Sequence, residues 1–87
     1  MKFTYFMYKC RHPNLVKIGS KIRMLRKRKG FSQEDFAAEA RLGRTYMGRI
    51  ERGEQNLSIQ NLIQIALTLN VEVYELMPRL CELKYPH

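Results

Sequence analysis

The sequence predicts an all-α protein, a compact five-helix bundle with a short aromatic arm in front of it. Between residues 16 and 77, apolar residues recur at helical spacing and show no strand-like alternation. Residues that start and stop helices divide this stretch into short segments. The chain has 87 residues, enough for one domain. We therefore expect an arm over residues 1–14, one domain over residues 15–80 and a C-terminal tail over residues 81–87.

The first helix is predicted over residues 16–29. The apolar residues of its inner face are Ile18, Ile22 and Leu25. Gly30 follows, as is typical just past a helix end. The preceding segment His12-Pro13-Asn14 is typical of a turn, and we expect that turn to separate the helix from the aromatic arm.

The second helix is predicted over residues 33–40. Ser32 can cap the free amide groups at its start, and an acidic pair follows in the first turn, where the helix dipole favours negative charge. Phe31, which precedes the cap, is spaced to pack against Phe36. Ala37 is small enough to let a neighbouring helix approach closely.

The third helix is predicted over residues 44–52 and ends at Gly53. The short turn Arg41-Leu42-Gly43 joins it to the second helix. Two short helices joined in this way form a helix-turn-helix, whose second helix can enter the major groove of DNA. Met47 and Ile50 are predicted to hold that helix on the core. The residues left on its outward face are Arg44, Thr45, Gly48, Arg49 and Arg52.

The fourth helix is predicted between the cap residue Ser58 and Asn70. Its apolar stripe consists of Leu62, Ile65, Ala66 and Leu69. A fifth short helix is predicted from Val73 to about Leu80, stopped or bent by Pro78. Four apolar residues in this region are predicted to lie partly in the core and partly on a dimer face: Val71, Val73, Tyr74 and Met77.

The charge balance is strongly positive, with 16 Lys and Arg against 8 Asp and Glu, a net charge of +8. The excess lies in residues 1–52, which hold 14 basic and 4 acidic residues. A chain that is positive in one half and near neutral in the other indicates a polyanionic partner for one face.

The sequence argues against several other classes of protein. No apolar run approaches about 20 residues, the length of a membrane-spanning helix. The histidines, His12 and His87, lie near the ends, and no Ser or Cys lies in a nucleophile motif, so we expect no enzyme. Cys10-Arg11-His12 has no second ligand pair at zinc-finger spacing, so we expect no metal ion and no cofactor. We interpret Cys10 and Cys81 as free thiols in a reducing cytoplasm, with their pairing as the alternative.

The outward face of the third helix has residue types that are suited to reading DNA. Arg44 and Thr45 lie in its first turn, where a recognition helix meets the edges of bases. An arginine can bind O6 and N7 of guanine, and the methyl group of threonine suits that of thymine. Gly48 is a poor helix former. Close approach of the backbone to DNA and tight packing between helices are two explanations for it.

Three segments carry a resemblance to a known family: Gly19-Ser20-Lys21-Ile22-Arg23-Met24-Leu25-Arg26, Phe31-Ser32-Gln33-Glu34-Asp35-Phe36-Ala37 and Tyr46-Met47-Gly48-Arg49-Ile50-Glu51-Arg52-Gly53. They resemble the Cro/repressor, or XRE-type, helix-turn-helix family, over about residues 16–77. This resemblance implies a λ-repressor-like bundle. Within the family, residues 44–58 are most similar to the controller proteins of restriction–modification systems, small dimeric regulators that time endonuclease expression.

The resemblance also implies residue roles. The family's base-reading positions fall on Arg44, Thr45 and Arg49. Its contacts to the DNA backbone fall on Gln33, Tyr46, Arg52 and Asn56, and a packed ring is the alternative role for Tyr46. A structural ion pair is implied between Arg26 and Glu51. This chain departs from the family at Arg41, where a glycine is common, and at Gly43, where a Ser, Thr or Asp cap is common.

The resulting hypothesis is a homodimeric transcription regulator in the cytoplasm, associated with the nucleoid. It would bind a roughly palindromic double-stranded operator, with RNA polymerase as a further partner, and control restriction–modification genes. The alternatives are a phage-type repressor and an antitoxin-like module that neutralises a protein partner and regulates its own expression. An RNA chaperone is a weaker alternative, because the basic face lacks the aromatic platform that single strands prefer.

Overall fold

The computed structural model describes residues 12–85, and within that range every regular element is helical. Four α-helices are followed by two 3₁₀ turns: α2 (Pro13–Arg28), α3 (Gln33–Ala40), α4 (Arg44–Arg52), α5 (Ile59–Leu69), η1 (Val73–Leu76) and η2 (Leu80–Glu82). The predicted all-α bundle is confirmed, with η1 as its fifth helix. The aromatic arm predicted over residues 1–14 lies outside the described residues as far as residue 11.

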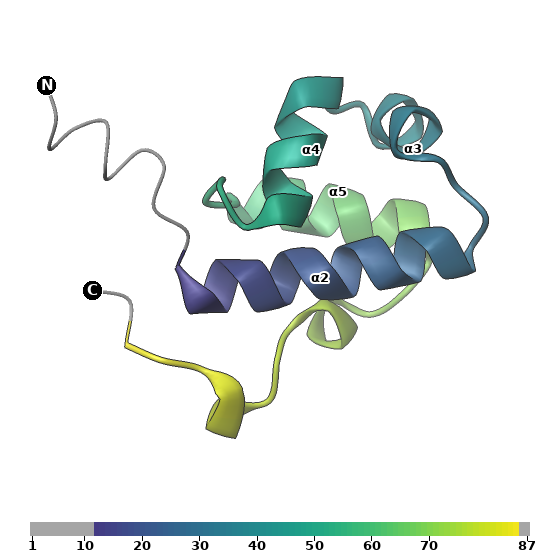
Figure 1. The fold of residues 1–87 in the computed structure, drawn as a ribbon. Helices are drawn as coiled ribbons and strands as arrows, with labels where there is room; N and C mark the ends of the chain where they lie inside the picture. Colours follow the sequence, from purple (N-terminus) through teal and green to yellow (C-terminus); the bar gives the residue numbers. More distant parts are fainter. Residues whose placement is uncertain (1–11, 86–87) are drawn as a thin grey trace, which may run out of the picture.

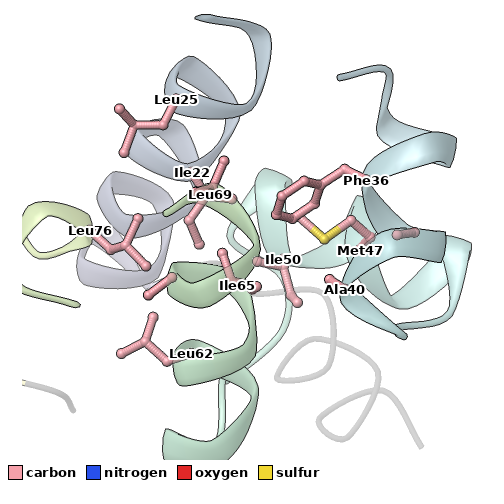
Figure 2. Close-up of a cluster of buried hydrophobic side chains, with 12 residues drawn as sticks. Ile22, Leu25, Phe36, Ala40, Met47, Ile50, Leu62, Ile65, Leu69 and Leu76 are labelled. Atoms are coloured by element: carbon pink, nitrogen blue, oxygen red, sulfur yellow. The ribbon is translucent and has the colours of Figure 1, made fainter. Parts of the chain in front are cut away.

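α2 is the helix around which the other elements are arranged (Figure 1). α3 and α4 lie on one side of it, whereas η1 and η2 lie on the opposite side. Side chains from α2, α3, α4 and α5 meet in one core, shown in Figure 2. The largest fully buried side chains are Phe36, Ile22, Met47, Ile50, Ile65, Leu69 and Leu76.

The two helices of the predicted helix-turn-helix have the predicted bounds, residues 33–40 and 44–52. Ser32 caps α3, because its Oγ accepts a hydrogen bond from the amide of Asp35 at 3.0 Å. The rings of Phe31 and Phe36 meet edge to face with centroids 5.3 Å apart, so the predicted contact across the cap is present.

The first helix begins at Pro13, and the predicted turn at residues 12–14 is wrong. Proline suits the first position of a helix, because the amide it lacks would have no partner inside the helix. His12 takes the cap position, and its Nδ1 accepts a hydrogen bond from the amide of Asn14 at 3.1 Å. The first helix therefore starts before residue 16, where the sequence predicts its start.

The helix predicted from Val73 to about Leu80 is wrong in its second half, because η1 ends at Leu76. Met77 is extended, at φ −96° and ψ 138°, as the residue before a proline usually is. The chain then turns back along the start of α2. The side chain of Asn14 holds the backbone of Lys84 there, donating to its carbonyl at 2.7 Å and accepting from its amide at 2.8 Å.

The turn between α3 and α4 requires a left-handed residue, and Arg41 fills it at φ 61° and ψ 42°. The same conformation ends α4 at Gly53 and α5 at Asn70. Glycine and asparagine adopt it readily, whereas a side chain such as that of arginine is strained by its Cβ. The departure from the family pattern at residue 41 therefore costs stability without changing the turn.

We expect Arg41→Gly to raise the free energy of unfolding by about 1 kcal/mol, because it removes this strain from an exposed position. Urea denaturation monitored by circular dichroism measures the change. Asn70→Gly is the matched control, and it should change stability less because asparagine tolerates the left-handed region. A loss of stability in Arg41→Gly would contradict the assignment.

Candidate nucleic-acid interface

The position of α4 is set from beneath by close contact with α2. A Cβ atom on Gly19 would lie 2.7 Å from the backbone oxygen of Glu51, so only glycine allows the two helices to approach this closely. Met47 and Ile50 of α4 are buried in the core, with 0% and 1% of their surfaces exposed. The underside of α4 is therefore fixed, as the sequence predicted.

The opposite face of α4 is turned outward. Arg44, Thr45 and Arg52 are exposed, and Arg49 is half-buried. The N-terminal turn of α3 lies beside this face, because Arg44 reaches Glu34 across the gap between the two helices. Arg44, Thr45 and Arg52 thus lie on the surface of α4 that faces away from the core.

Arg44 pairs with Glu34, with 2.8 Å between Nη1 and Oε2. The two side chains are 67% and 70% exposed, so water screens the attraction and the pair contributes about 0–1 kcal/mol at most. Breaking the pair therefore costs little. The sequence does not predict this contact, because the two residues lie on different helices and no spacing along the chain connects them.

Arg26 and Glu51 form a buried ion pair under the helix-turn-helix. Nε of Arg26 lies 2.6 Å from Oε2 of Glu51, and Nη2 lies 3.1 Å from Oε1. The third nitrogen, Nη1, donates to the backbone oxygen of Phe31 at 2.8 Å. Only 7% and 3% of the two side chains are exposed. Within the described residues, no buried side-chain nitrogen or oxygen lacks a hydrogen-bond partner.

Gln33 extends this network towards the surface. Its Nε2 donates to Oε1 of Glu51 at 3.1 Å, which fixes the orientation of the amide because a carboxylate can only accept. Gln33 is the first residue of α3 and is half-buried. One carboxylate therefore connects α2, α3 and α4.

Tyr46 and Asn56, the other residues assigned to the DNA backbone, differ in their surroundings. Tyr46 is half-buried against the core, and its hydroxyl accepts a hydrogen bond from Nδ2 of Asn61 at 2.6 Å. Asn56 is exposed in the loop between α4 and α5. The contact with Asn61 was also missed, because it joins α4 to α5 across the fold.

The residues assigned to a dimer face lie at η1 and around it. Tyr74 is 74% exposed and Val73 is also exposed, whereas Val71 and Met77 are half-buried against the core. α5 adds exposed Ile63 and Leu67 beside them. Together with Val71 and Val73, these two residues line a hollow of about 340 Å³. The i, i+4 spacing of Ile63 and Leu67 is a second apolar stripe that sequence reasoning did not use.

No group of three or more His, Cys, Asp or Glu side chains in residues 12–85 is arranged to hold a metal ion. Within the same range, no helix combines the length and apolar character that crossing a membrane requires.

Comparison with known proteins establishes the family. Residues 22–76 match the helix-turn-helix family HTH_3. The chain therefore belongs to this XRE-type family of DNA-binding transcription regulators. Control protein C.MunI of a Mycoplasma species is 44% identical over 62 residues, which cover 70% of this chain and 84% of that protein. Control protein C.BamHI of Bacillus amyloliquefaciens is 42% identical over 60 residues, covering 68% and 74%.

Solved structures show the same similarity. The restriction–modification controller protein C.AhdI from Aeromonas hydrophila has 42% identity and a TM-score of 0.74, covering 76% of this chain and 100% of that one. The biofilm regulator SinR, solved in complex with DNA, has 40% identity and a TM-score of 0.66, covering 68% and 95%. The fold is thus that of the family.

We expect Arg26→Met to lower the free energy of unfolding by about 3–5 kcal/mol, because it leaves the Glu51 carboxylate buried without its partner. Arg26→Met combined with Glu51→Leu should recover much of this loss, since no charge then remains buried. Urea denaturation of the wild type and the two variants measures both changes. A loss below about 1 kcal/mol in the single variant would show that the pair is dispensable.

Proposed function

We propose that the protein is a homodimeric, sequence-specific regulator of transcription that binds a roughly palindromic operator through α4. The observation that carries the proposal is the division of α4 into two faces. Met47 and Ile50 are fully buried, whereas Arg44 and Thr45 at the start of the helix are exposed. A helix held in this way presents its first turn to the major groove, the geometry by which helix-turn-helix proteins read base edges.

Arg44, Thr45 and Arg49 are the proposed base-reading residues. Arg44 supplies a fork of N–H donors suited to O6 and N7 of guanine. In the absence of DNA, Glu34 holds this guanidinium at the surface, and the pair is exposed enough for a base to replace the carboxylate at little cost. The sequence preference of the protein therefore rests first on the N-terminal turn of α4.

Gln33, Tyr46, Arg52 and Asn56 are the proposed contacts to phosphate. The amide of Gln33 keeps a second N–H after its bond to Glu51, and the hydroxyl of Tyr46 keeps its hydrogen after accepting from Asn61. Both groups can therefore donate to phosphate without losing their partners inside the protein. Contacts of this kind set the register on the duplex but do not read its sequence.

The dimer face is proposed on α5 and η1, where Leu67 and Tyr74 are each 74% exposed. Leu67 lines a hollow together with Ile63 and Val73, and exposed apolar side chains grouped in this way are typical of a surface that another protein covers. A two-fold axis through this face would present two copies of α4 to successive major grooves, about 34–36 Å apart. The operator half-sites would then lie about one helical turn apart.

Control of restriction–modification genes is the proposed biological role, with RNA polymerase as a further partner. The similarity to C.MunI, C.BamHI and C.AhdI supports this role. Selection of bound duplexes from a random pool tests the function directly. We expect an enriched, roughly palindromic sequence, and the absence of any enriched sequence would reject sequence-specific binding.

We expect Arg44→Ala to weaken binding to the selected duplex by about 1–3 kcal/mol and to relax the preference at one base position. Titration of fluorescent duplexes that differ at single positions measures both effects. Glu34→Gln is the matched control, because it removes the same ion pair but keeps the arginine. If both variants weakened binding alike, the effect would come from the ion pair and not from base reading.

We expect Leu67→Glu to convert the dimer into a folded monomer, because a charge on each copy would face an apolar surface across the two-fold axis. Sedimentation velocity over a range of concentrations measures the oligomeric state. Leu80→Glu, at an exposed leucine in η2, is the control and should remain dimeric. Unchanged association of Leu67→Glu would place the dimer face elsewhere.

A further inference from the structure

Gly48 lies in the middle of α4 on the side of Arg44 and Arg52, yet its surface is buried. The atoms that cover it belong to two side chains. A Cβ atom at this position would lie 3.1 Å from Nη1 of Arg52 and 3.5 Å from Oε1 of Gln33. The missing side chain of Gly48 therefore leaves a space that a guanidinium and a carboxamide share.

Neither the backbone conformation nor the packing of helices requires glycine here. The glycines with positive φ within residues 12–85 are Gly30 and Gly53. The nearest atoms to a Cβ on Gly48 belong to side chains, in contrast to Gly19, where they belong to the backbone of α4. Glycine is also the poorest helix former after proline. The reason for a glycine at position 48 is therefore the space that it leaves for the neighbouring side chains.

Arg52 is the last residue of α4, and its guanidinium lies back along the helix at the level of Gly48, one turn earlier. Its Nε donates to Oε1 of Glu54 at 3.2 Å, which leaves the two terminal nitrogens for other partners. The space above Gly48 thus places a positive charge in the middle of the outward face and not at the helix end.

Gln33 reaches the same space from α3. Its Nε2 donates to Glu51, whose carboxylate is held in turn by Arg26, so the oxygen of the amide faces Gly48. The buried ion pair fixes one wall of the space, and Arg52 forms the other. The amide of Gln33 and the guanidinium of Arg52 therefore border the same space, with Oε1 of Gln33 and Nη1 of Arg52 at 3.5 and 3.1 Å from the position of a Cβ on Gly48.

We propose that Gly48 is a positioning residue for DNA binding, which acts by leaving the room in which Arg52 lies beside Gln33. The two side chains then donate together to the oxygens of one backbone phosphate. This inference rests on the proposed function and deepens it. A better helix former at position 48 should therefore stabilise the protein but weaken its binding to DNA.

The test is a double-mutant cycle between positions 48 and 52 on the full chain, with the selected duplex as the probe. Gly48→Ala adds the smallest side chain, and Gly48→Met adds an uncharged one that fills the space. Each is made in the wild type and in Arg52→Ala. Arg79→Ala, which removes a positive charge from an exposed residue directly before η2, is the charge control.

We expect both substitutions of Gly48 to raise the midpoint of thermal unfolding, since both residues are better helix formers than glycine. Gly48→Met should weaken binding about tenfold, the loss expected from one charge-assisted hydrogen-bonding group, and Gly48→Ala should weaken it less. The slope of log K against log salt should flatten by about one, as in Arg52→Ala. When Gly48→Met is added to Arg52→Ala, the affinity for the selected duplex should fall by less than about twofold.

Additive losses from Gly48→Met and Arg52→Ala would overturn the inference, because the methionine would then obstruct the DNA by itself. Wild-type affinity in Gly48→Met would also overturn it. A changed preference at one base position in place of a uniform loss would reject the shared phosphate. If the wild type bound no duplex even at low salt, the proposed function would fail, and the role of Gly48 with it.

Discussion

The buried ion pair between Arg26 and Glu51 is the interaction on which the outward surface depends. Burying two charges is costly unless their geometry is good and their remaining hydrogen-bonding groups find partners. Both conditions hold, because the guanidinium makes two contacts to the carboxylate and a third to the oxygen of Phe31, and Gln33 donates to the same carboxylate. The network lies where Gly19 brings α2 and α4 together. It therefore fixes both the distance between the helices and the rotation of α4.

Because the buried face of α4 is fixed, the arginine side chains on its exposed face can change partners without disturbing the helix. Arg44 and Arg52 each pair with a glutamate at the surface, at 2.8 and 3.2 Å. The pair of Arg44 is exposed on both sides and contributes little to stability, so a base edge can replace its carboxylate. Arg52 contacts Glu54 through Nε, so its terminal nitrogens are left for phosphate. The carboxylates also limit the side-chain freedom of the arginines before DNA arrives, which reduces the ordering cost of binding. In the proposed function, stability and recognition thus rest on different charges in the same helices.

Local signals predicted α3 and α4 to the residue, because Ser32, Gly53 and the apolar spacing act within one or two turns. The wrong turn at residues 12–14 arose because proline is compatible with two local structures. His12-Pro13-Asn14 is typical of a turn, but proline also suits the first position of a helix, and Pro13 begins α2. The contacts of Arg44 with Glu34 and of Tyr46 with Asn61 join different helices, so no spacing in the chain encodes them. The sequence was enough to predict which face of α4 is buried, whereas these hydrogen-bond partners could be identified only in the three-dimensional structure.

The glycines show how the fold separates explanations that the sequence leaves open. Close approach to DNA and tight helix packing both accounted for Gly48 in the sequence. In the structure, the glycine at which two helices pack tightly is Gly19, where an added Cβ would meet the backbone of α4. At Gly48 an added Cβ would meet the ends of two flexible side chains, so the fold would tolerate it and the arginine would have to move. The fold does not require glycine at position 48, and glycine weakens α4. Its presence is explained by the space that it leaves for the side chains of Arg52 and Gln33.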